Sequence, residues 1–144
     1  QRETFAAGGR FVFEPFSAEE AIRIVELIDS LAEGSVGGLI SLYALGGAVG
    51  EKAPDETAFF YRKALNIIAL TADWENPDVK CDSLSWFASR YSVLQQMTCG
   101  SYVNFPNLEN YSFMCDYYGG NADCLRKIKD RIDPCNLFCF PQSI

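Results

Sequence analysis

Leu65-Asn66-Ile67-Ile68-Ala69-Leu70-Thr71-Ala72-Asp73-Trp74 is the longest β-strand candidate in this chain. Two shorter apolar runs precede it, at residues 39–45 and 58–62, and short turns join the three segments. Consecutive strands joined in this way are typical of an antiparallel sheet. A further strand is expected at residues 9–15, where Pro15 closes it.

Two helices are expected to back this sheet. The first starts at a capping box, in which the Ser17 hydroxyl caps the amide of Glu20 and Glu20 reaches back. We expect Gly34 to stop this helix. Its apolar face is predicted to contain Ala21, Ile24, Val25, Ile28 and Leu31.

The second helix is expected to begin at the cap residue Asp82 and to run to about Met97. Its apolar residues recur at helical spacing: Leu84, Phe87, Tyr91 and Leu94, with Trp86 beside them. We interpret this aromatic stripe as core packing rather than as a binding surface. The predicted fold class is therefore α+β, an antiparallel sheet backed by helices.

The chain changes character after Cys99, because residues 100–120 are aromatic, polar and rich in turn formers. Asn121 is expected to cap a last short helix that turns Leu125 and Ile128 inward and ends at Asp133. The tail, residues 136–144, is apolar enough to dock on another surface. Residues 46–50 are glycine-rich, but we expect a proline-containing turn after them instead of a helix, and therefore no phosphate-binding loop.

Composition excludes several classes of function. The 144 residues carry a net charge of −7, which argues against nucleic acid as a partner. The basic residues at 126–131 are interrupted by aspartate and are read as a solvated helix face. No apolar run is long enough to span a bilayer, so no membrane segment is expected. The chain has no histidine, which removes histidine acid–base chemistry and histidine metal sites.

Six cysteines remain, and none forms a C-x-x-C pair, so no metal site is predicted. Their even number favours disulfides and a secretory route, and the alternative is buried free thiols. Asn110-Tyr111-Ser112 is a glycosylation sequon, which places a possible glycan on Asn110 and also fits secretion. The start, Gln1-Arg2-Glu3-Thr4, lacks a signal-peptide pattern and suggests a processed terminus or a fragment.

The motifs from about Leu39 to the end occur in a recognisable order. They lie at residues 46–49, 53–62, 100–108, 117–121, 125–129, 133–138 and 140–144. The third of them contains Tyr102-Val103-Asn104, which resembles the Y-x-N motif of berberine-bridge-type FAD-linked oxidoreductases. In this order the motifs resemble the C-terminal portion of that family, within the vanillyl-alcohol-oxidase-type flavoproteins.

The resemblance implies two regions. Residues 1–97 correspond to the end of the family's substrate domain, and residues 98–144 to a segment that returns to the FAD domain and completes it. The FAD diphosphate site and any covalent link would lie in the N-terminal half of the family's polypeptide. We therefore expect a partner chain, cut from the same precursor, that carries this half.

The same resemblance implies roles for individual residues. Tyr102, Asn104, Tyr118 and Asn121 are expected near the flavin, and Tyr102 is the expected catalytic residue. Tyr118 as a core residue and Asn121 as a helix cap are the local alternatives. Phe105, Tyr43 and Tyr61 are expected in a pocket for a small-molecule substrate.

This sequence departs from the family at two of these positions. Phe105 stands where many carbohydrate oxidases of the family have a tyrosine base, and Tyr61 stands where histidine is expected. The expected function is an FAD-dependent oxidoreductase that passes hydride from an alcohol, sugar or secondary metabolite to flavin N5, with O2 as acceptor. The alternative is a non-catalytic flavin-binding subunit with a storage or defence role.

Overall fold

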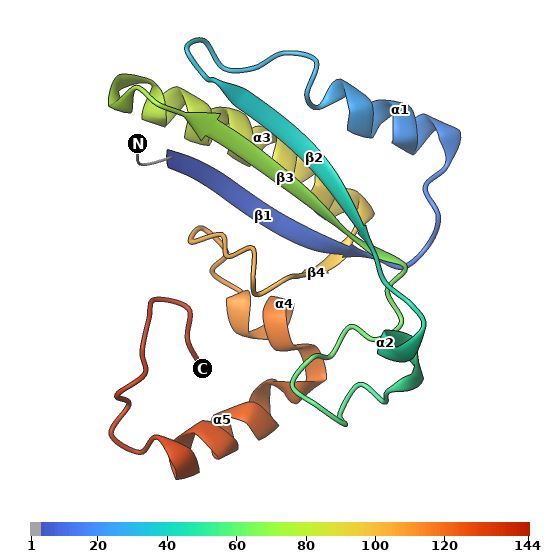
Figure 1. Ribbon diagram of the computed structural model, residues 1–144, viewed down its shortest axis with the longest axis vertical. Coiled ribbons are helices and arrows are strands. Elements are labelled where there is room, and N and C mark those ends of the chain that lie inside the picture. Colours follow the sequence, from blue (N-terminus) through green and yellow to red (C-terminus); the bar gives the residue numbers. More distant parts are fainter. Residues whose placement is uncertain (1–3) are drawn as a thin grey trace.

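The computed structural model describes residues 4–144. The expectation that the start of the chain lacks a signal-peptide pattern therefore concerns mostly residues 1–3, which lie outside the described part. Four strands form one antiparallel sheet in the order β2-β3-β1-β4 (Figure 1). They are β1 (Thr4–Val12), β2 (Gly37–Ala44), β3 (Asn66–Trp74) and β4 (Cys99–Ser101). The predicted α+β fold with a helix-backed antiparallel sheet is confirmed.

β3 is the central strand, as its apolar sequence indicates. It pairs along its whole length with β1 on one side and with β2 on the other. The strands predicted at residues 65–74 and 39–45 are confirmed. β1 begins earlier than predicted and ends before Pro15, whose ring nitrogen has no proton for a ladder.

One strand prediction is wrong, and one strand was not predicted. Residues 58–62 form no strand, because Tyr61 is buried against the sheet instead of extending beside it. The three-residue β4, which no pattern predicted, pairs with β1 at Arg10 and Phe11. The first residues of the predicted C-terminal region, 98–144, thus belong to the sheet through β4. The boundary between the two regions at residue 97 stays a prediction.

The first helix, α1 (Ala18–Glu26), has the predicted capping box. It ends with Leu27 as its cap, well before Gly34. The buried face is narrower than predicted, because Ile24 and Leu27 are buried whereas Val25 is 62% exposed.

The second helix, α3 (Lys80–Met97), follows the 3₁₀ turn η1 (Pro77–Val79) and starts two residues before Asp82. It lies behind the sheet in Figure 1 and covers one sheet face together with α1. The helix-side core consists of Val12, Ile24, Leu27, Ile68, Leu70, Ala72, Trp86, Phe87, Tyr91 and Leu94. The interpretation of the aromatic stripe as core is confirmed.

Three short helices surround the lower end of the sheet in Figure 1. A single turn, α2 (Ala48–Glu51), follows the glycines at 46–47, so the expected direct passage into a turn was wrong. α4 (Phe113–Tyr118) continues through η2 (Gly119–Asn121) into α5 (Ala122–Ile132).

α5 ends at Asp133 as predicted, but it buries no residue. Ile128 is 38% exposed, so the expected inward orientation of this face was wrong. The tail docks through a polar residue: Gln142 is buried and accepts from the Tyr117 hydroxyl at 2.8 Å. Leu137 and Phe138 are about four-fifths exposed.

Three further expectations concern disulfides, metal sites and membrane-spanning helices. All six cysteines are exposed free thiols, so the structure forms none of the expected disulfides. In residues 4–144 no group of histidine, cysteine or carboxylate side chains is arranged to hold a metal ion. None of the helices described there is long and apolar enough to cross a membrane.

Candidate functional site

The sheet has one covered face and one open face. Residues of β1 and β3 alternate between them, so Ile68 and Leu70 point to α3 whereas Phe11 and Ile67 point away. An aromatic cluster forms on this second face around Phe11. It consists of Phe11, Tyr43, Phe59, Phe60, Tyr61, Tyr102 and Phe105.

The segment after β4 places the Y-x-N residues on this face. The Tyr102 backbone N–H donates to the Gly9 carbonyl at 2.8 Å, and the Phe105 N–H donates to the Tyr102 carbonyl at 3.0 Å. The Asn104 side-chain amide donates to the Tyr102 hydroxyl oxygen at 2.9 Å. A Cβ on Gly9 would lie 2.8 Å from the Phe105 ring, so only glycine allows this close approach.

Tyr43 and Phe105 form the solvent-facing part of the cluster. Their ring centroids lie 5.6 Å apart with an interplanar angle of 33°. Tyr43 is 47% exposed, and Phe105 is partly buried between Tyr43 and Tyr102. The structure therefore brings four of the predicted residues together: Tyr43, Tyr102, Asn104 and Phe105.

Tyr61 lies deeper, under this surface. Its ring stacks on Phe11 at 4.2 Å, and its hydroxyl donates to the Asp116 carbonyl at 2.7 Å. Burial raises the pKa of Tyr61 well above its ordinary value, which disfavours a role as a base. A Cβ at Gly100, whose φ is +64°, would collide with the Tyr61 hydroxyl. Tyr61 therefore supports the cluster from below, and its predicted contact with substrate stays a prediction.

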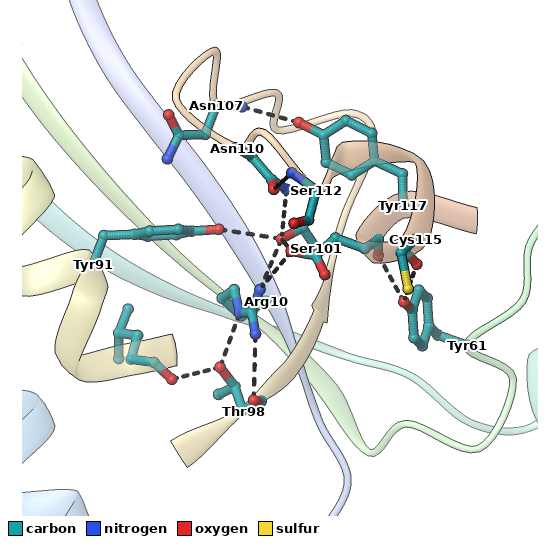
Figure 2. A network of polar contacts seen from close by, with 12 residues as sticks. Arg10, Tyr61, Tyr91, Thr98, Ser101, Asn107, Asn110, Ser112, Cys115 and Tyr117 are labelled. Carbon is teal, nitrogen blue, oxygen red and sulfur yellow. Dashed lines mark hydrogen bonds and ion pairs between the residues drawn. The ribbon is translucent and has the colours of Figure 1, made fainter. Parts of the chain in front are cut away.

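A buried arginine connects the sheet to the C-terminal segment (Figure 2). Arg10 is 6% exposed and donates to the Ser101 hydroxyl at 2.9 Å, the Thr98 hydroxyl at 3.1 Å and the Asp116 carboxylate at 3.3 Å. The same guanidinium donates to the Thr98 carbonyl at 3.3 Å. No sequence motif pointed to Arg10. It could have been noticed as the single cation of β1, at a position that the alternation of the strand turns toward α3.

Tyr118 and Asn121 lie in a different place from the Y-x-N residues. The Asn121 side-chain amide donates to the carbonyls of Pro54 and Thr57, at 2.6 and 3.0 Å, and makes no cap for α5. Asn121 occupies the N-cap position of α5 as expected, but its side chain makes no cap hydrogen bond, because it holds the loop at residues 54–57 instead. Tyr118 is buried, which agrees with the core alternative. Flavin contact of either residue stays a prediction.

The sequon asparagine has a local structural role. The Asn110 side-chain oxygen accepts from the Ser112 N–H at 3.2 Å, and its amide nitrogen lies 3.5 Å from the Ser101 hydroxyl (Figure 2). Tyr111 is 92% exposed. Glycosylation of Asn110 stays a prediction.

The chemistry of these groups fits the ring end of a flavin but not its diphosphate. Exposed aromatic faces can stack on a planar ring, and the Tyr102–Asn104 pair leaves a hydroxyl proton and an amide oxygen for its polar edge. A diphosphate needs cations or helix N-termini. On α5, Arg126 and Lys129 pair with Asp123 and Asp133, and the ion pairs of the described residues do not include Lys127 or Arg131.

Comparison with known proteins identifies the family that the chain resembles. The family described as "Berberine and berberine like" matches residues 101–144. The uncharacterized FAD-linked oxidoreductase YgaK of Bacillus subtilis is 35% identical over the whole of this chain, which covers 32% of YgaK. The chain thus spans about a third of the length of the curated relatives it matches.

Solved structures show the same arrangement of elements. The structure of BBE-like #28 from Arabidopsis thaliana superposes on 99% of this chain with a TM-score of 0.86, at 27% identity, and the match covers 34% of that protein. Berberine bridge enzyme from Eschscholzia californica, at 22% identity, has the same fold, with a TM-score of 0.88 over all of this chain and 33% of its own.

Proposed function

Because this chain belongs to the berberine-bridge-enzyme-like family of FAD-linked oxidoreductases and corresponds to its C-terminal portion, we propose that it is part of an FAD-dependent oxidoreductase. The substrate is a small organic molecule, an alcohol, a sugar or a secondary metabolite. Bound FAD supplies a redox-active ring that accepts hydride at N5 and is reoxidised by O2. The observation that carries the proposal is the juxtaposition of the Tyr102–Asn104 pair with the exposed ring of Tyr43 and the partly buried ring of Phe105.

This chain's own residues hold and orient the reactants. The amide oxygen of Asn104 and the hydroxyl proton of Tyr102 would hold the polar edge of a bound flavin ring. Tyr43 and Phe105 provide an apolar platform that orients a substrate and excludes water from it. Tyr61 stacks on Phe11, Phe11 contacts Tyr102, and Tyr102 contacts Phe59. Tyr61 therefore helps to hold Tyr102 and Phe59 in place from the buried side of the cluster.

The proton of the substrate needs an acceptor that Phe105 does not provide. Tyr102 is the titratable group in the Y-x-N segment, and the Asn104 amide donates to its hydroxyl oxygen. A donor in this position stabilises negative charge that develops on the oxygen. We therefore assign proton transfer to Tyr102, whose hydroxyl oxygen would take the substrate proton as its own proton passes to the polar edge of the flavin. A bound flavin would supply the hydride acceptor.

The diphosphate site belongs to a partner chain, cut from the same precursor, that corresponds to the family's N-terminal two-thirds. The share of the relatives that the chain covers supports this proposal. The sequon at Asn110 supports a secretory-pathway location. The six free thiols give that location no support.

A second function, a flavin-binding subunit without turnover and with a storage or defence role, has one observation in its favour. Phe105 replaces a proton acceptor, and Tyr61, the next tyrosine in the cluster, has its hydroxyl committed to a backbone carbonyl. In this case the platform would shield the flavin from substrates.

The test uses the protein isolated from its source without denaturant. A visible spectrum with flavin bands and a second polypeptide on a denaturing gel are expected. Anaerobic addition of alcohols, sugars and aromatic metabolites should bleach the flavin if the protein is an oxidoreductase. Flavin bands that no substrate bleaches would favour the second function, and a colourless protein would overturn both.

A further inference from the structure

The C-terminal tail buries an amide and leaves its large apolar side chains outside. Leu137, Phe138 and Phe140 are 60–80% exposed, whereas Gln142 is 4% exposed. Burial of an amide is costly unless its donor and its acceptor both find partners. Specific hydrogen bonds, and not apolar burial, therefore set the position of Gln142.

Gln142 uses both ends of its side chain. Its Oε1 accepts from the Tyr117 hydroxyl at 2.8 Å, and its Nε2 donates to the Asn107 carbonyl at 2.7 Å. The same nitrogen donates to the Asn110 carbonyl at 3.3 Å. The Tyr117 hydroxyl oxygen in turn accepts from the Asn107 N–H at 3.2 Å (Figure 2). Gln142, Tyr117 and Asn107 thus form a closed cycle of three hydrogen bonds, the Gln142 clamp.

The clamp holds Asn107 by both of its backbone groups. Asn107 lies at the exit of a turn that the Phe105 N–H closes by donating to the Tyr102 carbonyl. The sheet fixes the entrance of this turn, where the Tyr102 N–H donates to the Gly9 carbonyl. Asn104 is exposed between these two anchors, and its side-chain amide donates to the Tyr102 hydroxyl. The orientation of Asn104 therefore depends on the anchor at Asn107.

We propose that Gln142 is a positioning residue of the flavin site. Together with Tyr117 it fixes Asn107, and through the turn it keeps Asn104 directed at the polar edge of a bound flavin. No apolar side chain can replace Gln142, since the clamp needs an acceptor for Tyr117 and a donor for Asn107 in one planar group. The inference rests on the proposed function, because Asn104 has this task only where a flavin binds.

Gln142→Glu tests the clamp with a side chain of the same shape. A protonated carboxyl accepts from Tyr117 and donates to the Asn107 carbonyl, as the amide does. An ionised carboxylate has no donor and faces the carbonyl oxygens of Asn107 and Asn110. Burial favours the protonated form, so the clamp should hold at about pH 5 and open as the pH rises to about 8.

Tyr117 is the titratable group among the hydrogen-bond partners of Gln142. Burial raises the pKa of its hydroxyl, and its neighbours Tyr91, Tyr118 and Asp116 act in the same direction, so it stays protonated over this pH range.

A change between about pH 5 and 8 that Gln142→Glu shows and the unchanged protein lacks therefore reports the new carboxyl. Gln96→Glu makes the same substitution at an exposed position of α3 and is the matched control. It should behave like the unchanged protein at both pH values.

Two readouts are taken on the flavin-loaded protein together with its partner chain. At about pH 8, kcat per bound flavin should be about tenfold lower in Gln142→Glu than in the unchanged protein. KM should change less than about twofold, because Tyr43 lies on β2, outside the turn. The Asn107 amide, which donates within the clamp, should exchange with solvent about tenfold faster. At about pH 5 these differences should disappear. A merely stabilising role would leave kcat per bound flavin unchanged.

Tyr117→Phe gives a second test that depends on no ionisation. It keeps the aromatic ring and removes the hydroxyl that joins Gln142 to the Asn107 N–H. Its kcat and the exchange of its Asn107 amide should match those of Gln142→Glu at about pH 8, and should do so at both pH values. The double variant should lose little more than either single variant, because both substitutions open the same clamp. Tyr111→Phe, at an exposed tyrosine of the same segment, should change neither readout.

The outcomes separate this inference from the proposed function. If the protein oxidises a substrate and both variants keep its kcat, the positioning role is overturned and the function stands. A lower kcat without faster exchange at Asn107, or one that persists in Gln142→Glu at about pH 5, also overturns the positioning role. If flavin is bound but no substrate is oxidised, a shift of the flavin absorption bands in Gln142→Glu between the two pH values supports the inference, and unchanged bands overturn it. A colourless protein overturns both.

Discussion

The two faces of the sheet are built in different ways. The helix-side core draws its large residues from β3, α1 and α3, where they recur at strand or helix spacing. The aromatic cluster on the open face draws single residues from distant segments, among them Phe11, Tyr43, Tyr61 and Phe105. The first face stabilises the fold, and the second carries the rings to which we assign the substrate platform.

The largest expected effect concerns the helix-side core. Leu94 is fully buried under the sheet, so Leu94→Ala should lower the free energy of unfolding by about 3–5 kcal/mol. The loss combines transfer of the side chain with the cavity left behind. Urea unfolding followed by circular dichroism measures it. Leu108→Ala, at a residue 70% exposed, is the control and should change stability by less than about 0.5 kcal/mol.

The next effect concerns the residue that joins the sheet to the C-terminal segment. Arg10→Met should cost about 3 kcal/mol, because it leaves Ser101, Thr98 and Asp116 without their shared donor. Asp116 is partly exposed, so water compensates some of this loss.

The control for Arg10 is an arginine on the surface. Arg126 pairs with Asp123 in solvent, and Arg126→Met should change stability by at most about 0.5 kcal/mol. Equal losses from the two arginine variants would show that the buried network does not connect the segments.

Sequence patterns predicted the helix-side core because its contacts depend on local periodicity. The apolar run of β3 and the stripe of α3 each specify their own buried face, whatever the rest of the chain does. The capping box of α1 is equally local, since Ser17 and Glu20 are three residues apart.

The open face could not be derived in this way. Whether Phe11 meets Tyr61 or Tyr102 depends on the register of β1 and on β4, a strand too short to leave a pattern. Tyr102 and Asn104 were identified through family resemblance alone. Gly9 and Gly100 were informative but ambiguous, because a glycine in a strand indicates a close approach without identifying the approaching residue.

A smaller effect on stability is expected at Tyr61, the buried tyrosine of the aromatic cluster. Tyr61→Phe removes the hydroxyl that donates to the Asp116 carbonyl and should cost about 1 kcal/mol near neutral pH. Because the pKa of Tyr61 is raised in the folded state, the unfolded state loses its proton first. The contribution of Tyr61 to stability should therefore be constant below about pH 10 and fall as the pH rises further.

The variant is tested by measuring the free energy of unfolding above about pH 10, the alkaline limb of the stability curve. Tyr61→Phe should make the decline in unfolding free energy above about pH 10 shallower without removing it, because burial also raises the pKa of Tyr91, Tyr117 and Tyr118. Tyr111→Phe, at a residue that is almost fully exposed, should leave the limb unchanged. An unchanged alkaline limb in Tyr61→Phe would mean that burial does not raise the pKa of Tyr61.

The smallest effect on stability should accompany the clearest effect on function. Tyr43 is nearly half exposed, so Tyr43→Ala should change the free energy of unfolding by at most about 1 kcal/mol through the lost contact with Phe105. In the flavin-loaded protein the same change should raise KM about tenfold, because the substrate loses its aromatic platform, while the flavin spectrum stays the same. Leu42→Ala is the matched control, since Leu42 is the preceding residue of β2, is 62% exposed and points to the other sheet face. If both variants kept the original KM, the open face would carry no substrate, and the contrast between the two faces would be one of packing alone.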